Sequence, residues 1–341
     1  MSQEVAIKDV ALRAGVSPAT VSNALSGKRP VAEETRQRIL AAAEDLNYRP
    51  NLVARGLRRQ ETHTIALLVA DISNPYYPAV ARAIHDRVGA KGYVSFIGNT
   101  DGEAEAEVRV LEEMRARSVD GVIMGTMALS AERIRNVLGP TIPLVLLTGE
   151  LLAPGAGGVP AVRADQVGTD DEIGIRAGVR HLQANGLHDI GFVSGPDGSV
   201  PGAGRLDSFR RALSEAGLDL REDWIEHAPA YTREAGTQAA DRLLSRTHRP
   251  SAIMCANDLI AIGVLQSARE HELTVPSDLA VVGFDDIETA QLVTPPLTTI
   301  INPASLVGVA CADALLRRIE HPESAYAHVA LPTRLVVRES A

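Results

Sequence analysis

Side chains able to bind a small polar molecule follow several apolar runs of this 341-residue chain. Tyr76 and Tyr77 stand in DISNPYYPAV, Arg205 in SGPDGSVPGAGRLDSF and Asp285 in VVGFDD. A tyrosine ring can stack on a ligand while its hydroxyl forms a hydrogen bond at the rim of a pocket. A guanidinium can contact hydroxyls or an anion in bidentate fashion, and a carboxylate can accept two hydroxyl hydrogen bonds. These residue types predict non-covalent recognition of a polyol or another small polar molecule.

Structural roles compete with this interpretation. The two tyrosines could pack in a core, although only 3% of the residues are aromatic, which favours a functional role for an adjacent pair. Arg205 could form a salt bridge at a helix start, for instance with Asp207. Asp258 could cap a helix and Asp286 could form a turn. Among these aspartates, Asp285 is the better ligand candidate.

Motifs of covalent or metal-dependent catalysis are missing. The sequence holds no GxSxG, no P-loop and no GxGxxG fingerprint. His181, His188 and His227 lack metal-ligand spacing and are interpreted as surface or structural residues. We therefore expect no catalytic residue, no metal and no cofactor. An enzyme on an α/β scaffold would be favoured again only by turnover or a bound metal.

The segment IKDVALRAGVSPATVSNALSG, residues 7–27, predicts two short helices joined by a tight turn. Gly15 accepts the backbone angles of a sharp turn. Ser17 can cap the second helix, and Pro18 fits its first turn. This is helix-turn-helix geometry, in which the second helix enters the major groove of DNA. An ordinary helical hairpin is the alternative.

Two further segments follow this motif. AEETRQRILAAAEDLN, residues 32–47, predicts a third helix that can close a three-helix core. In YRPNLVARGLRR, residues 48–59, Pro50 forces an extended break and Asn51 can cap a short helix. Gly56 weakens that helix, because glycine costs about 1 kcal/mol relative to alanine in a helix interior. We expect this helix to form only when something else holds it.

Charge is unevenly distributed along the chain. Residues 1–59 hold ten Lys/Arg and six Asp/Glu, a net charge of +4, whereas the whole chain carries −9, so the remainder carries −13. A basic head on an acidic body suits nucleic-acid binding by the head alone. Cys255 and Cys311 fit buried free thiols in a reducing compartment. Without a signal peptide or a long apolar span, we expect a soluble cytoplasmic protein.

The body alternates apolar β-rich runs with helical stretches. We expect strands at 65–71, 93–99, 121–125, 143–148, 189–195, 251–258 and 279–286, and helices at 77–92, 104–118, 172–186, 205–217 and 259–272. This alternation is typical of parallel sheets covered on both faces, here two doubly wound subdomains. Ligands of such sheets bind at the carboxyl ends of strands, so the natural pocket is the cleft between the subdomains.

The motifs at 7–27 and 49–59, together with LPTRLVVRES at 331–340, closely resemble the lactose-repressor (LacI/GalR) family of bacterial transcription regulators. The resemblance runs through the whole chain. It implies an α/β fold with a helix-turn-helix headpiece (1–50), a hinge helix and linker (51–62) and an effector-binding and dimerisation core (63–341). The core is expected to resemble periplasmic binding proteins, with subdomains of roughly 63–163 and 164–300 and a C-terminal segment crossing between them.

The resemblance also implies the DNA contacts. Leu57 matches the family's hinge leucine, which wedges into the minor groove and kinks the DNA; packing within a linker is the alternative. Pro18 and Ala19 could make only apolar base contacts, whereas Asn23 could bond adenine or a phosphate. The remaining expected DNA contacts are those of Ser17, Thr20, Ser22, Asn51 and Arg55. The operator implied is a palindrome with a central CG step.

In the effector site, the resemblance adds three residues. Asn257 matches a ligand-contacting asparagine, Tyr231 an aromatic residue that stacks on sugars, and Thr148 stands where many relatives have an aspartate. Ser199 replaces an arginine of purine-responsive relatives, which argues against a purine. We expect a homodimeric repressor of operator DNA controlled by a sugar or sugar derivative, with nucleosides and other small polar metabolites left open. A small-molecule binding protein without regulatory DNA binding is the alternative, and no membrane is expected as a partner.

Overall fold

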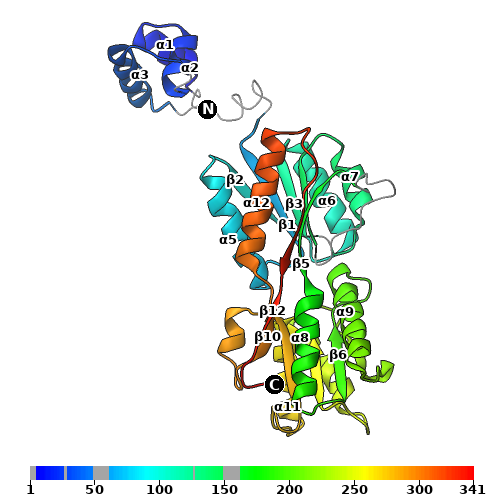
Figure 1. Ribbon diagram of the computed structural model, residues 1–341. Coiled ribbons are helices and arrows are strands. Elements are labelled where there is room, and N and C mark those ends of the chain that lie inside the picture. Colours follow the sequence, from blue (N-terminus) through cyan, green and yellow to red (C-terminus); the bar gives the residue numbers. More distant parts are fainter. Residues whose placement is uncertain (1–4, 27–28, 49–60, 126, 149–161) are drawn as a thin grey trace. The chain divides into compact units, whose positions relative to one another are not determined.

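The computed structural model describes residues 5–26, 29–48, 61–125, 127–148 and 162–341. It divides into two compact units, residues 1–62 and residues 63–341, which we describe separately (Figure 1). The predicted hinge residues Asn51, Arg55 and Leu57 lie outside the described residues.

The first unit is a three-helix bundle. Its helices are α1 (Ile7–Ala14), α2 (Pro18–Ser26) and α3 (Glu33–Asp45). α1 ends at Gly15, whose φ of 66° is the left-handed conformation that glycine adopts without strain. Small apolar side chains fill the bundle, among them Val10, Val21 and Ile39. Because alanines surround these larger residues, the three helices can approach closely around a small core.

The second unit, the core, contains two sheets. In the first, the strand order is β11-β5-β4-β3-β1-β2 and all pairs are parallel. Its strands are β1 (Thr64–Val69), β2 (Val94–Asn99), β3 (Gly121–Gly125), β4 (Leu144–Thr148), β5 (Asp165–Asp170) and β11 (His328–Pro332). Its helices are α5 (Tyr76–Gly89), α6 (Ala104–Ala116), α7 (Ala131–Leu138) and α12 (Ala304–Glu320).

The second sheet has the order β12-β10-β9-β8-β6-β7, in which only the β10–β12 pair is antiparallel. Its strands are β6 (Ile190–Ser194), β7 (Ile225–His227), β8 (Ala252–Cys255), β9 (Ala280–Asp285), β10 (Thr298–Ile301) and β12 (Arg334–Val336). Its helices are α8 (Asp171–Ala184), α9 (Val200–Ala216), α10 (Arg233–Leu244) and α11 (Asp258–Glu270), with short 3₁₀ turns at Glu222–Trp224 and Glu288–Gln291.

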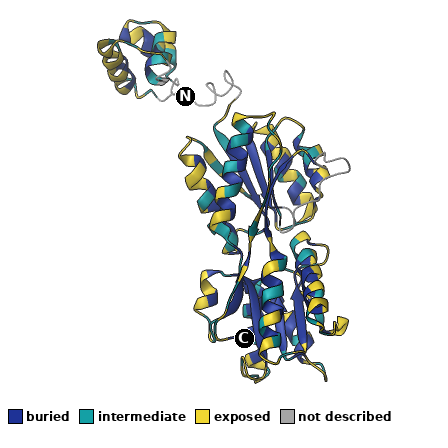
Figure 2. Cartoon of the chain, in the orientation of Figure 1, coloured by how far each residue is buried: buried dark blue, intermediate teal, exposed yellow. Residues whose placement is uncertain are grey.

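Helices cover both faces of each sheet, and the strands between them are buried (Figure 2). In β1, Ile65 and Leu67 pack with α5 and α12, whereas the alternating Ala66 and Leu68 pack with α6 and α7. A strand buried on both faces must be apolar at every buried position, which explains the continuous run IALLV after the half-buried Thr64. The predicted α/β class with two doubly wound subdomains is confirmed.

The chain crosses three times between the two sheets, after β5, after β10 and after β11. The first crossing therefore follows Asp170, later than the boundary near 163 expected from the sequence, because β5 pairs with β4 in the first sheet. Two crossings are bonded to each other, since the Thr333 hydroxyl donates to the Asp170 carbonyl at 2.6 Å and accepts from the Gly174 amide at 2.9 Å.

Candidate functional site: a headpiece surface and an inter-subdomain cleft

In the headpiece, the N-terminus of α2 presents small polar side chains. Ser17 Oγ accepts a hydrogen bond from the Thr20 amide at 3.2 Å and shares one with Thr20 Oγ1 at 2.9 Å, so Ser17 caps α2. Ser17, Pro18, Ala19 and Ser22 are exposed. Capping holds the first turn of α2 together while its outer face stays accessible, as insertion into a groove requires.

The remaining expected DNA contacts on α2 are Thr20 and Asn23, and both are half-buried. The described part of the headpiece thus gathers all the expected contacts of residues 17–23 on one short helix and its capping turn.

In the core, a cavity of about 60 Å³ lies between the two subdomains. Residues of both subdomains and of the crossings line it: Tyr76, Tyr77, Gly125, Met127, Leu147, Thr148, Thr169, Val200, Pro201, Arg205 and Asn302. A space of this size holds about two water molecules. This part of the cleft must therefore widen before it can hold a ring-sized molecule, since ligand pockets are usually about 300–1,000 Å³. A larger cavity of about 290 Å³ shares the lining residues Thr169, Val200 and Pro201 with it.

Arg205 is the central polar group of this cleft and has a side-chain exposure of only 8%. Its Nε lies 2.9 Å from Asp171 Oδ2, its Nη1 donates to the Ala256 carbonyl at 2.6 Å, and its Nη2 lies 3.8 Å from Asp285 Oδ1. The guanidinium also stacks on the Phe284 ring at 3.8 Å. Burial alone would lower the pKa of Arg205, but Asp171 and Asp285 outweigh burial and raise it.

Asp285 lies at the carboxyl end of β9, in a backbone conformation that aspartate rarely adopts, with φ of 117°. Such strain persists only where the surrounding structure enforces it, and it is found at ligand sites. Asp285 Oδ1 accepts from Asn302 Nδ2 at 3.1 Å. Burial raises the pKa of Asp285 to about 6, because the Arg205 guanidinium offsets only part of the desolvation.

The tyrosines of the first subdomain close the opposite wall. The rings of Tyr76 and Tyr77 meet edge to face, 5.4 Å apart. Both rings pack against the core cluster of the first subdomain and also line the cavity, so the packing and the ligand-binding interpretations both apply. Burial raises the pKa of both hydroxyls, which therefore stay protonated and can donate hydrogen bonds.

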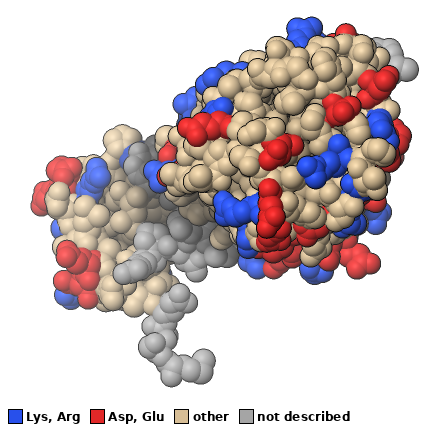
Figure 3. Space-filling model, turned by 90° about the horizontal axis from the view of Figure 1, so that it is seen from below, with Lys and Arg blue, Asp and Glu red and all other residues tan. Residues whose placement is uncertain are grey.

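Within the described ranges, no group of three His, Cys, Asp or Glu side chains is placed to hold a metal ion. Cys255 and Cys311 are free and buried, as expected. Acidic and basic side chains are interspersed on the face of the core shown in Figure 3, rather than gathered in one basic patch. No described helix is long and apolar enough to cross a membrane.

Comparisons with known proteins extend this geometry. Residues 6–51 match the model of "Bacterial regulatory proteins, lacI family", and residues 179–341 match a periplasmic binding protein-like domain. Over 98% of this chain and 99% of theirs, the chain is 34% identical to the ribose operon repressor of Escherichia coli (strain K12) and 32% identical to catabolite control protein A of Priestia megaterium.

The chain belongs to the LacI family of bacterial transcription regulators. A solved structure of the Lac repressor dimer bound to operator and the anti-inducer ONPF matches 99% of both chains, with 27% identity and a TM-score of 0.87. The resemblance predicted from the motifs is confirmed, as is the fold of a helix-turn-helix headpiece with a binding-protein-like core. The family consists of regulators, so the expectation of a protein that is not an enzyme is confirmed as well.

For this LacI-family chain, the structure brings together Tyr76, Tyr77, Thr148 and Arg205 as cavity-lining residues. Asp285 stands directly behind them, in contact with Arg205 and Asn302.

The two other expected effector residues, Tyr231 and Asn257, do not line this cavity. Tyr231 is held by a 2.9 Å hydrogen bond to the Ser199 hydroxyl. Asn257 caps α11 through the Ile260 amide at 2.9 Å, and its Nδ2 has no partner among the described residues.

The structure also decides between the alternative roles of Arg205 and Asp258. Arg205 pairs with Asp171 rather than with Asp207, which bonds Arg210 instead. Asp258 does not cap α11. Its carboxylate accepts from the Ile287 amide at 2.8 Å and from the Thr299 hydroxyl, and so fixes the loop that follows β9.

The sequence analysis missed two residues of the LacI-family cleft, Asp171 and Asn302. Each directly follows a strand that was not predicted, β5 and β10, so the signal used for Asp285 was available once those strands were known.

Proposed function

We propose that this LacI-family protein is a homodimeric repressor that binds a palindromic operator and is released or retained by a small polar effector in the cleft. The observation that carries the proposal is that one chain holds both a capped helix-turn-helix and an Arg205-centred cleft between two subdomains. We assign residues 1–50 to the headpiece, 51–62 to the hinge and 63–341 to the core.

DNA binding is proposed to involve two parts of the chain. The start of α2, where Ser17, Pro18, Ala19 and Ser22 are exposed, would enter the major groove and contact bases and phosphates. Leu57, with Asn51 and Arg55 beside it, would wedge into the minor groove at the centre of the operator. Because Pro18 and Ala19 offer no hydrogen bonds, deformation of the DNA would supply much of the specificity.

A homodimer is supported by the free edge of the first sheet. β2 is an edge strand, and its Val94, Phe96 and Ile97 are about half exposed. On α12, Leu306 is also exposed, at 61%. Exposed apolar edges of this kind are usually covered by a partner. A second copy would also supply the second headpiece that a palindrome requires.

Effector control is supported by the size of the cavity. A ring-sized effector can occupy the space between Arg205 and the two tyrosines only if that space widens, and it would then contact both subdomains, so it favours one relative position of the subdomains. The weak hinge helix around Gly56 would respond to that position, which couples the cleft to the operator. A regulator of the chromosome would act in the cytoplasm.

Binding to DNA, measured by fluorescence anisotropy, tests this proposal. The wild type and Leu57→Ala are titrated with near-palindromic DNA that has a central CG step, and with scrambled DNA, in the presence and absence of sugars and nucleosides. Ribose is included because one relative is a ribose operon repressor. Selective, salt-sensitive binding that Leu57→Ala weakens and that one compound shifts is expected.

Equal affinity for both DNAs, unchanged by Leu57→Ala, would reject the hinge mechanism. A compound that binds without any effect on DNA would favour the alternative, a small-molecule binding protein.

A further inference from the structure

The cavity in the cleft has a single positive charge. Arg205 is the one cation among the described residues that line the cavity. Residue 126 and residues 149–161, which adjoin lining residues in the sequence, contain no Lys, Arg or His. An anion in this cavity would therefore depend on Arg205 for its countercharge, whereas Arg211 lines the adjoining cavity.

Two carboxylates already occupy Arg205. Asp171 is 7% exposed and pairs with Nε at 2.9 Å, and Asp285 approaches Nη2 at 3.8 Å. Asp171 is itself fixed, because its Oδ1 accepts from the Thr169 hydroxyl at 2.6 Å. With both carboxylates ionised, this triad has a net charge of −1, so an anion would be repelled and would have to displace a buried partner of the guanidinium.

The cleft does offer groups for a neutral ligand. Asn302 Oδ1 is buried and has no hydrogen-bond partner among the described residues, so it can accept from a hydroxyl. Tyr76 and Tyr77 line the same space, and a tyrosine hydroxyl can donate a hydrogen bond. Hydroxyl groups both donate and accept, and they match these groups without adding charge.

We propose that Asp171 is a specificity-determining residue that makes the cleft reject anionic effectors and select uncharged, hydroxyl-bearing ones. The proposal rests on the proposed function only in taking this cleft as the effector site. Asp171 excludes phosphate esters and carboxylates by covering Arg205, which is discrimination by a repulsive element as well as by attraction.

Inorganic phosphate is the probe for this proposal, titrated into the full-length protein against chloride at constant ionic strength and at pH 7.5, where it is a mixture of the monoanion and the dianion. Asp171→Asn removes the charge that covers Arg205. Asp170→Asn is the matched control, because it is the same change one residue earlier, on an exposed side chain that caps α8 and does not contact Arg205. Binding is measured by calorimetry and by the shift in melting temperature.

Asp171→Asn is expected to bind phosphate at least about tenfold more tightly than the wild type and Asp170→Asn, which should not differ from each other. Asp285→Asn removes the other carboxylate beside Arg205 and is expected to show the same gain in phosphate affinity. It replaces Asp171→Asn in the test if Asp171→Asn does not unfold cooperatively. Saturable phosphate binding to the wild-type cleft, or no gain in either uncovered variant, would overturn the proposal.

The operator experiment remains independent of this result. A gain of phosphate affinity in a protein that ignores DNA would keep Asp171 as an anion filter and reject the repressor. Effector-controlled operator binding without a gain of phosphate affinity would keep the repressor and reject Asp171 as an anion filter. If ribose binds, ribose 5-phosphate gives a direct comparison, and the ester is expected to bind at least about tenfold more weakly to the wild type.

Discussion

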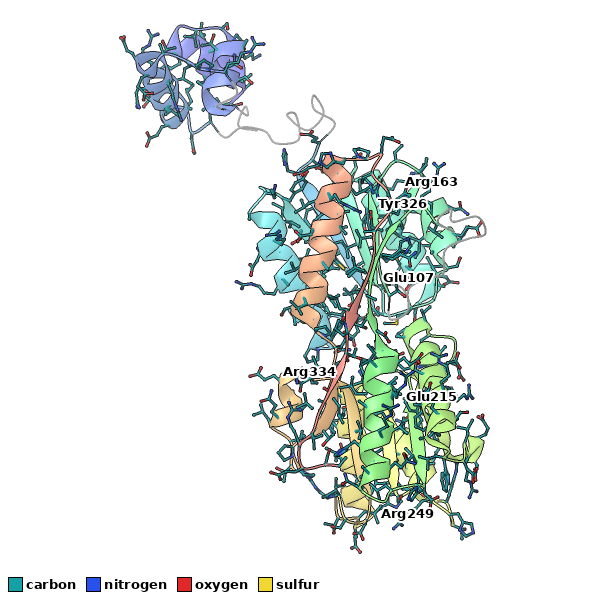
Figure 4. The ribbon with its side chains drawn as sticks, in the orientation of Figure 1. Glu107, Arg163, Glu215, Arg249, Tyr326 and Arg334 are labelled. Carbon is teal, nitrogen blue, oxygen red and sulfur yellow. The ribbon has the colours of Figure 1, made fainter. Side chains whose placement is uncertain are left out.

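The Val200 amide donates a hydrogen bond to the Met127 carbonyl at 3.3 Å, which joins the second subdomain to the first beside the cavity. The Met127 end of this bond is fixed by Glu107 of α6, which lies at the end of the first subdomain that faces the second (Figure 4). The fully buried Glu107 carboxylate accepts from the amides of Met127 at 2.7 Å and Leu129 at 2.9 Å. The bond therefore links the start of α9 to a segment of the first subdomain that Glu107 holds in place.

Removal of this bond is expected to open the cleft. Val200 is the first residue of α9, where proline fits because the N–H is not used within the helix. Val200→Pro removes the donor, whereas Val200→Ala keeps it and removes a similar part of a 40% exposed side chain. We expect the proline variant alone to show longer or broader distances between subdomains.

Spin labels on cysteines introduced at the exposed positions Glu112 and Ser214 report that distance by pulsed electron paramagnetic resonance. Cys255 and Cys311 should stay unlabelled, because they are buried and burial raises the pKa of both thiols. Identical distance distributions in Val200→Pro and Val200→Ala would mean that the Val200–Met127 bond does not hold the cleft.

Capping and DNA contact can be separated at Ser17. Ser17→Ala removes the cap of α2 and should destabilise that helix by about 1 kcal/mol. Ser17→Asp keeps an oxygen that can cap, but it places a negative charge beside the phosphates. We expect hydrogen exchange of the α2 amides to rise only in the alanine variant, and operator affinity to fall at least about tenfold in the aspartate variant. Unchanged DNA affinity in Ser17→Asp would place Ser17 away from the phosphates.

A buried ion pair network anchors β11 to the first sheet. Asp165, which is fully buried, pairs with Arg318 at 2.9 Å and Arg317 at 2.6 Å and accepts from the Ala327 amide at 2.7 Å. Asp165→Asn leaves the buried Arg318 undercompensated and should lower the free energy of unfolding by about 3–5 kcal/mol. Urea denaturation measures this loss.

The exposed pair of Arg117 and Glu113 provides the control for Asp165. Glu113→Gln removes a carboxylate from a solvated i,i+4 pair and should cost less than about 1 kcal/mol. Equal losses in Asp165→Asn and Glu113→Gln would show that burial of the Asp165 network adds no stability.

The Asp165 network also explains why β5 could not be predicted from the sequence. The strand β1 was predictable because apolar residues fill every position after Thr64, and the headpiece was predictable because Gly15, Ser17 and Pro18 are local signals. β5 reads DQVGTD, which has no such pattern. Its buried Asp165 is satisfied by arginines about 150 positions away, and no local pattern reports a partner at that distance.

In the cleft, too, some features were predictable from the sequence and others were not. Arg205 and Asp285 were predictable because they follow motifs and apolar strands. The pairing of Arg205 with Asp171 was not, because it depends on a crossing that brings the start of α8 beside α9. Local chemistry thus predicted the main polar residues of the site, while tertiary topology decided their partners.

The last prediction concerns the pH dependence of stability through Asp285. Its pKa is raised by burial from 3.8 to about 6, so the folded protein favours the protonated carboxyl more than the unfolded chain does. This contribution to stability is fully present below about pH 4, is lost as the pH rises towards 6, and stays absent above. Burial also raises the pKa of Asp258, which contributes with the same sign.

Asp285→Asn should therefore flatten part, not all, of the decrease in unfolding free energy between pH 4 and pH 6, measured by urea denaturation at several pH values. Asp207→Asn, on an exposed side chain, should keep the wild-type slope. The sign of the effect is decisive, because a carboxylate stabilised mainly by Arg205 would have a lowered pKa and would stabilise the protein as the pH rises. A steeper decrease in Asp285→Asn would show that the Arg205 charge outweighs the burial of Asp285.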